Sequence, residues 1–97
     1  MYDYRFHLKA QIEYEDAVKW YALRSEKAAL NFVLQVENTL TVICQHPHQF
    51  KNEFKEFYLI GLKKYPYTIV YKINEKSKVI EIYAVFHQKQ HPSKKYK

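Results

Sequence analysis

The sequence predicts an α+β fold in the order β-α-α-β-β-β, with a helical hairpin packed on a twisted antiparallel sheet. Two observations support this fold: apolar residues recur at helical spacing in two successive segments before residue 46, and three β-type runs follow between residues 57 and 86. Short loops join the three runs, so these strands should form an antiparallel meander. The apolar face of such a sheet needs a cover, which the two helices supply. The 97 residues predict a single domain, 1–97, with a basic C-terminal tail over residues 87–97.

The first two elements are a short strand and an amphipathic helix. Residues 4–8 alternate between polar and β-prone types, which predicts the strand. From Lys9 onward the pattern changes to the spacing i, i+4, i+7, i+8 and i+11, which places one apolar stripe along a helix. The stripe consists of Ala10, Tyr14, Ala17, Val18 and Tyr21.

A second helix follows a short polar break over residues 23–26, where Ser25 is a candidate N-cap. Apolar residues again recur at helical spacing up to about His46, because Pro47 disfavours helical geometry in the residue before it. Cys44 is the only cysteine and lies within this pattern, so it cannot form an internal disulfide and is predicted to be a small core residue. A short connection between two such helices predicts an antiparallel hairpin.

The rest of the chain predicts a polar loop from His46 to Lys55 and then three strands. The strands are expected over residues 57–62, 67–73 and 79–86. Strict alternation places two sets of residues each on one face of the sheet: Tyr67, Ile69, Tyr71 and Ile73, and Ile80, Ile82, Ala84 and Phe86. Tyr71 is therefore expected to pack in the core.

The net charge of +6 is concentrated in the second half of the chain. Residues 1–50 contain five Lys and Arg against six Asp and Glu, whereas residues 51–97 contain eleven Lys against four Glu. This asymmetry favours an anionic partner, such as RNA, DNA or an acidic protein segment, and the alternative is a solubility role. Gly61 is the only glycine, so the sequence has no Gly-rich phosphate loop, and it shows no nucleophile motif. It shows no signal peptide and no membrane span either, which predicts a cytoplasmic protein.

Several of these features together resemble the RelE/ParE superfamily, whose members are toxins of bacterial type II toxin–antitoxin systems. The resemblance rests on the element order, on a first helix ending in Trp20-Tyr21, on Pro47, and on two strand sequences at residues 65–71 and 82–87. It implies growth inhibition, plasmid stabilisation and neutralisation by a cognate antitoxin whose extended and helical segments wrap the toxin. A homodimer and a toxin–antitoxin hetero-oligomer are both open, and no cofactor is expected.

The resemblance implies one of two activities. ParE-like members inhibit DNA gyrase, and RelE-like members are metal-independent endonucleases that cut mRNA on the ribosome. We favour the ParE-like activity because the hairpin of strands is long and uninterrupted, and because Gln90 stands where relatives often carry an arginine. A third hypothesis is an inactive homologue that acts as a binding module.

An RNA-cleaving site would need a base, an acid and cations at the scissile phosphate. The candidates are His87, His91, Lys55 and Tyr96. The alternative for His87, which we favour, is a strand-terminal imidazole bonded to the backbone. A metal site is not expected, because no Cys or carboxylate cluster joins the histidines.

Binding residues are predicted at two places. Lysines that could contact a nucleic acid or another target are Lys63, Lys64, Lys89, Lys94 and Lys95, although the last two also fit a solvated tail. Trp20 and Tyr21 could anchor the antitoxin, although aromatic residues on a helix more often serve in packing.

Overall fold

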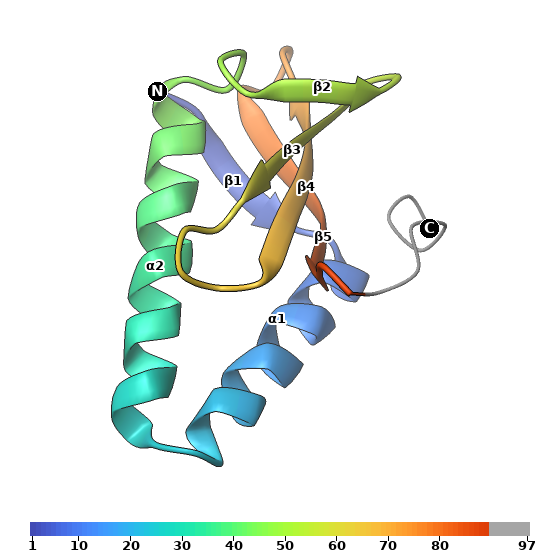
Figure 1. Ribbon diagram of the computed structural model, residues 1–97. Helices are drawn as coiled ribbons and strands as arrows, with labels where there is room; N and C mark the ends of the chain where they lie inside the picture. The colour runs from blue at the N-terminus through green and yellow to red at the C-terminus, as the bar shows by residue number, and fades with distance from the viewer. Residues whose placement is uncertain (90–97) are drawn as a thin grey trace.

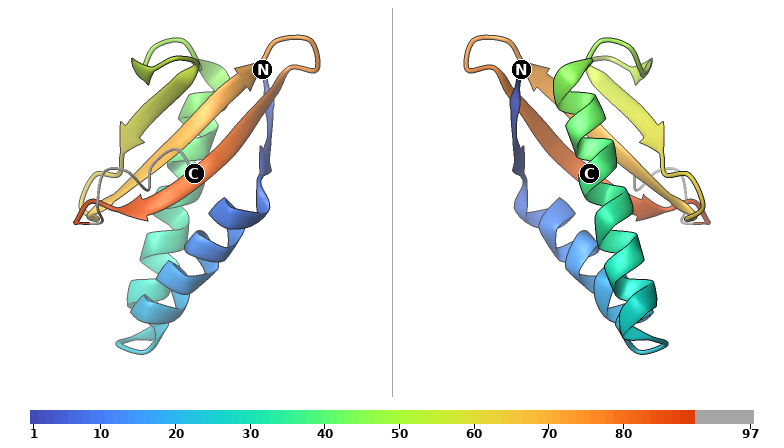
Figure 2. Two further views of the ribbon diagram at one scale, coloured as in Figure 1. Left: turned by 90° about the vertical axis from the view of Figure 1, so that its right-hand side faces the viewer. Right: turned by 90° about the vertical axis from the view of Figure 1, so that its left-hand side faces the viewer.

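The computed structural model describes residues 1–89, apart from the side chain of Glu53. Its elements are β1 (Asp3–Phe6), α1 (Leu8–Ala22), α2 (Glu26–Gln45), β2 (Lys51–Phe54), β3 (Phe57–Gly61), β4 (Tyr67–Asn74) and β5 (Val79–His87) (Figure 1). The strands form one five-stranded sheet in the order β1-β5-β4-β3-β2. Both helices contribute side chains to the main hydrophobic core, together with β4 and β5. The ribbons in Figure 2 show α2 crossing one face of the sheet. The predicted α+β fold, a helical hairpin on a twisted sheet, is confirmed.

The sheet differs from the prediction in one pairing. β2 to β5 form an antiparallel meander, but β1 pairs with β5 in parallel, so the sheet is mixed. The first strand of the chain therefore lies beside the last one, with Tyr4 opposite Ile80 and Phe6 opposite Ile82. Parallel neighbours need a long crossover between them, and here almost the whole chain provides it.

The predicted loop from His46 to Lys55 is wrong, because it contains the edge strand β2. Lys51 pairs with Leu59 and Asn52 pairs with Tyr58, and the chain then turns back at Lys55, whose φ is 52°. A strand at the edge of a sheet is often short and carries charged side chains. The polar composition of this segment therefore does not exclude a strand.

Both predicted ends of the second helix, α2, are confirmed to within one residue. The Ser25 hydroxyl accepts a hydrogen bond from the Ala28 N–H at 2.9 Å, which caps α2, and α2 ends at Gln45, two residues before Pro47. Cys44 is buried, as predicted. No helix within residues 1–89 is long and apolar enough to cross a membrane.

The prediction that Ala84 and Phe86 share one face of β5 with Ile80 and Ile82 is wrong. Ile80, Ile82 and Val85 pack in the main core, whereas Ala84 and Phe86 join a second cluster with Val70. The cause is a β-bulge: consecutive residues of β4, Val70 and Tyr71, stand opposite Ala84 and Ile82, which leaves Tyr83 as an extra residue. One extra residue in a strand moves every following side chain to the other face.

Tyr71 lies in the core, as predicted, and also holds the segment that follows α2. Its side chain is fully buried, and its hydroxyl donates a hydrogen bond to the Pro47 carbonyl at 2.7 Å. Burial, assisted by the neighbouring Tyr58, raises the pKa of the Tyr71 hydroxyl, so it remains a donor at every physiological pH.

Replacing Tyr71 by phenylalanine should lower the free energy of unfolding by about 1–3 kcal/mol, because the buried Pro47 carbonyl loses its donor. Urea unfolding followed by circular dichroism measures this loss. Tyr58→Phe is the matched control: this half-buried ring stacks on Tyr71 at 5.3 Å but does not donate to Pro47. Equal losses in the two variants would contradict the role of the hydrogen bond.

Candidate functional site

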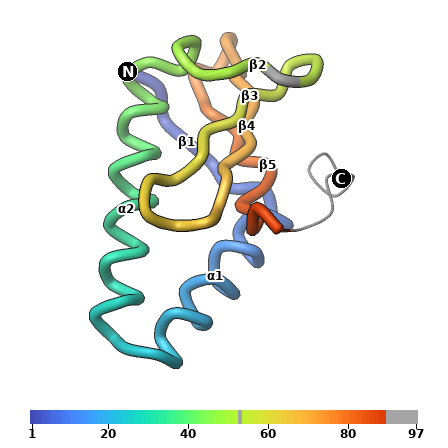
Figure 3. Tube along the Cα trace, viewed as in Figure 1, coloured from blue at the N-terminus to red at the C-terminus, as the bar shows by residue number. Residues whose placement is uncertain are grey.

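The C-terminal end of β5 lies against the loop that joins β3 to β4. Tyr67 stands opposite His87, their rings meet edge to face at 5.1 Å, and the Gln88 N–H donates a hydrogen bond to the Pro66 carbonyl at 2.8 Å. The end of β5 therefore lies beside the loop between β3 and β4, which carries Lys63 and Lys64. Figure 3 shows the course of both segments. Both lysines are exposed.

His87 is half-buried and bonded to the backbone that follows it. Its Nδ1 accepts a hydrogen bond from the Lys89 N–H at 3.1 Å, so in this geometry Nδ1 carries no proton and a neutral ring is protonated at Nε2. This is the arrangement expected of a strand-terminal imidazole bonded to the backbone. The ring is not enclosed, however, because it lines a small pocket of about 140 Å³.

The other residues around this pocket include the two predicted antitoxin anchors, Trp20 and Tyr21. Trp20 is 48% exposed, and the guanidinium of Arg24 lies 3.3 Å from its ring centroid, a cation–π contact. Tyr21 is half-buried and stacks on Phe32 at 4.9 Å, so most of its ring serves in packing. Trp20 and Tyr21 on α1 and His87 on β5, which were predicted separately, therefore lie at one surface.

Lys55 lies away from this surface. It occupies the turn between β2 and β3, where its ammonium lies 5.2 Å from the Phe54 ring centroid. Tyr58, next to this turn, pairs with Tyr71, whereas His87 pairs with Tyr67. Four residues of an extended strand separate these two positions along β4, a distance of about 13 Å. The structure therefore does not bring Lys55 and His87 to one phosphate-sized site.

Four other predicted site residues lie outside the described residues: His91, Lys94, Lys95 and Tyr96. Gln90, which stands where relatives often carry arginine, lies outside them too. The predictions for these five residues remain predictions. Lys89, the last described residue, is exposed directly after β5.

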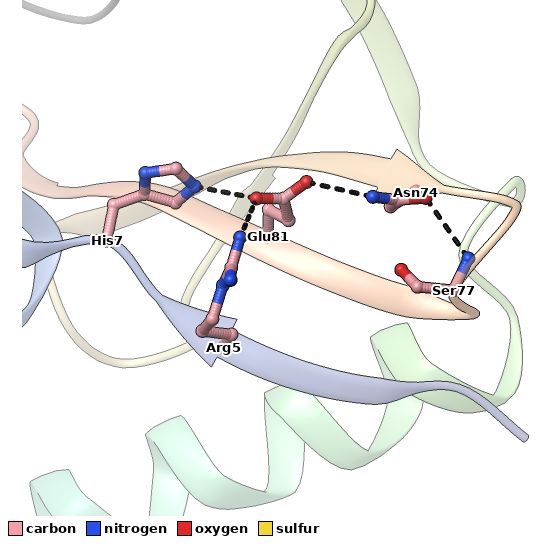
Figure 4. A network of polar contacts seen from close by, with 5 residues as sticks. All are labelled: Arg5, His7, Asn74, Ser77 and Glu81. Carbon is pink, nitrogen blue, oxygen red and sulfur yellow. Dashed lines mark hydrogen bonds and ion pairs between the residues drawn. The ribbon is translucent and has the colours of Figure 1, made fainter.

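A polar network on β1 and β5 was not predicted (Figure 4). The Glu81 carboxylate accepts hydrogen bonds from Arg5 at 2.5 Å and from His7 at 2.9 Å, and its second oxygen accepts one from Asn74 at 3.5 Å. The hydrogen bond from Arg5, and then that from His7, holds the pKa of the Glu81 carboxyl below its ordinary value, although burial acts in the opposite direction. Arg5 and Glu81 belong to strands far apart in the sequence, and only the pairing of β1 with β5 makes their side chains neighbours.

The same side of the sheet carries a second cation, Lys72. Its ammonium lies 4.7 Å from the Phe57 ring centroid, 5.1 Å from that of Tyr83, and 3.4 Å from the Glu56 carboxylate. Arg5 and Lys72 thus each face a carboxylate. Within residues 1–89, no group of three His, Cys, Asp or Glu side chains could hold a metal ion.

The helical hairpin on a twisted five-stranded sheet matches the fold of solved ParDE and RelE toxin structures. The family model described as "ParE toxin of type II toxin-antitoxin system, parDE" matches residues 4–92. Since this match spans nearly the whole chain, the protein belongs to the ParE toxin family. A search of curated protein sequences found no match.

Solved structures show the same fold at low sequence identity. A chain of the chromosomal ParDE toxin–antitoxin system from P. aeruginosa is similar with a TM-score of 0.74 and 16% identity, over 90% of this chain and 96% of that one. The isolated E. coli RelE toxin has a TM-score of 0.59 and 17% identity, over 96% and 90% of the two chains. A chain of the intact E. coli RelBE toxin–antitoxin complex has a TM-score of 0.62 and 16% identity, over 93% and 100%.

Proposed function

We propose that this toxin inhibits DNA gyrase without cutting nucleic acid, and that a cognate antitoxin neutralises it. The observation that supports this proposal most is the match to the ParE toxin family over residues 4–92. The alternative is a RelE-like, ribosome-dependent mRNA endonuclease, and the third hypothesis is an inactive homologue that acts as a binding module.

The positions of His87 and Lys55, the two candidate catalytic residues that the structure describes, also favour the non-hydrolytic activity. A metal-independent nuclease needs its base, acid and cations around one phosphate. Here His87 accepts a bond from the Lys89 backbone, and Lys55 is separated from it by about 13 Å of strand. Arg5, whose planar guanidinium suits phosphate best, is already held by Glu81.

Two assays separate the three hypotheses. The proposed function predicts that the purified toxin blocks supercoiling by purified gyrase and leaves a translated mRNA intact in a toe-printing assay. New mRNA ends, abolished by Lys55→Ala or His87→Ala with antitoxin binding retained, would instead establish the endonuclease. A toxin that is harmless when expressed and inactive in both assays would be a binding module.

The basic loop between β3 and β4 should contribute to target binding. Lys64→Glu is expected to weaken gyrase inhibition about three- to tenfold, because it reverses an exposed charge in the loop that lies against the end of β5. Lys76→Glu is the matched control, since Lys76 is also exposed but lies in the turn between β4 and β5, at the other end of β4. Titration of both variants in the supercoiling assay measures the effect, and equal inhibition by the two would contradict a role for this loop.

A further inference from the structure

The outer face of α2, on the side away from the core, is nearly free of charge. Residues 28–45 contain one charged side chain, Glu37, whereas α1 contains five and 27% of the whole chain is charged. A surface helix ordinarily carries charged residues on its solvent side. Here three exposed residues are large and apolar instead: Leu30 is 58% exposed, Leu34 48% and Val42 40%. Depletion of charge around exposed apolar side chains is typical of the core of a protein–protein interface.

The exposed apolar residues of α2 belong to one row along the helix. Its members are four residues apart, which makes them neighbours on one ridge: Leu30, Leu34, Asn38 and Val42. The buried residues of the same helix lie on its other side: Phe32, Val36, Leu40 and Ile43. Ridges of this spacing commonly pack against the same kind of ridge on a second helix.

A slot of about 310 Å³ lies beside the C-terminal half of this row. Asn38 and Val42 line it from α2, and Phe50 and Ile60 add apolar side chains. β2 begins at Lys51, opposite Leu59, so it does not extend over Gly61, which also lines the slot. Leu30 and Leu34 stand in the other half of the row and do not line the slot. The row therefore has exposed leucines in one half and a partly apolar recess in the other.

Charge favours a second copy of the chain as the occupant of this face. The net charge is +6, and the positive excess lies in residues 51–97. An acidic protein segment or a nucleic acid is attracted to those lysines rather than to a neutral helix face. A second copy offers an equally neutral face, so two chains that otherwise repel each other meet at their least charged surface.

The row is also complementary to itself. A two-fold axis between Leu34 and Asn38 makes two α2 helices antiparallel, which sets Leu30 opposite Val42 and Leu34 opposite Asn38. Leu30 and Leu34 of the partner subunit then lie at the mouth of the slot, because Asn38 and Val42 line it. The symmetry repeats this contact at the second slot.

We propose that two copies of the toxin form an antiparallel dimer through the outer face of α2. The leucines of each copy cover the slot of the other. The slot shares no lining residue with the pocket beside His87, so the dimer does not depend on which target the toxin inhibits. One helix and one slot provide less than the about 800 Å² per partner of a standard interface, so the association should be weak, with a Kd of about 10–100 µM.

Sedimentation velocity of the full toxin without antitoxin, from about 1 to 500 µM, measures this equilibrium. Leu34→Glu should raise the dimer Kd at least about tenfold, because it places a carboxylate in an uncharged contact. Leu23→Glu is the matched control, since Leu23 is 86% exposed at the end of α1 and outside the row. It should keep the Kd within about twofold, and thermal melts establish that both variants are folded. A wild-type toxin that stays monomeric, or equal Kd values for the two variants, would overturn the proposal.

Cross-linking tests the geometry of the dimer separately. Cys44 is buried, so Asn38→Cys introduces an exposed thiol close to the two-fold axis. A short bismaleimide should join two copies of this variant, and adding Leu34→Glu to it should lower the yield at least about fivefold. Leu23→Cys should not cross-link, because the dimer holds the two ends of α1 apart. Equal yields for Asn38→Cys and Leu23→Cys would overturn the proposal. So would loss of antitoxin binding in Leu34→Glu without any cross-link through Asn38→Cys, which would assign this face to the antitoxin.

Discussion

Replacing Phe32 by alanine should lower the free energy of unfolding by about 3–5 kcal/mol, the cost of deleting a fully buried aromatic ring. Phe32 lies at the centre of an aromatic cluster, with ring centroids 4.9 Å from Tyr21, 5.3 Å from Tyr65 and 5.4 Å from Tyr67. These partners come from α1, from the loop between β3 and β4, and from β4. The cavity would therefore loosen the contact between the helical hairpin and the sheet.

The same substitution should also alter the pocket beside His87, because Tyr21 and Tyr67 line it and rest on Phe32. Urea unfolding measures the stability, and Leu34→Ala is the matched control, since Leu34 is on the same helix but 48% exposed. The control should lose less than about 1 kcal/mol. A loss below about 1 kcal/mol in Phe32→Ala would show that the aromatic cluster does not hold the hairpin to the sheet.

Replacing Glu81 by alanine should cost about 1–3 kcal/mol, because the hydrogen bonds that tie β1 and the start of α1 to β5 are lost. The Glu81 side chain is only 15% exposed, which distinguishes it from ordinary surface ion pairs. Amide exchange should quicken most in β1, whose four residues pair with the rest of the sheet only through β5.

The same carboxylate should make the stability of the toxin pH-dependent. Hydrogen bonds from Arg5 and His7 hold the pKa of Glu81 below the ordinary value of 4.5. The folded state therefore binds the proton more weakly than the unfolded state, so this stabilisation is fully present above pH 4.5 and is lost as the pH falls through the lowered pKa.

Unfolding titrations between neutral pH and acid should show a shallower fall in Glu81→Gln than in the wild type. Glu56→Gln is the matched control, because Glu56 pairs with Lys72 but its side chain is 79% exposed. The control should keep the wild-type slope over this range. A Glu81→Gln variant with the wild-type slope would contradict a role for Glu81 in acid sensitivity.

Local signals in the sequence determined the elements of this protein and much of its core. The Ser25 cap, the stop before Pro47, and the alternation that buries Ile69 and Tyr71 each depend on neighbours a few residues away. The same holds for the charge asymmetry and for the strand sequences that resemble the RelE/ParE superfamily. The polar strand β2 was missed because an edge strand needs no apolar face.

Only the tertiary structure decided how these elements meet. Pairing β1 with β5 joins Arg5 to Glu81, residues at opposite ends of the chain, and the packing of α1 brings Trp20 to the same pocket as His87. The bulge at Tyr83 reverses the face of the following residues, and the late start of β2 leaves Gly61 at an unpaired edge. Short-range patterns fix secondary structure because they act within one turn or one strand. Strand partners, register and bulges result from competition among many distant pairings, which only the packed core resolves.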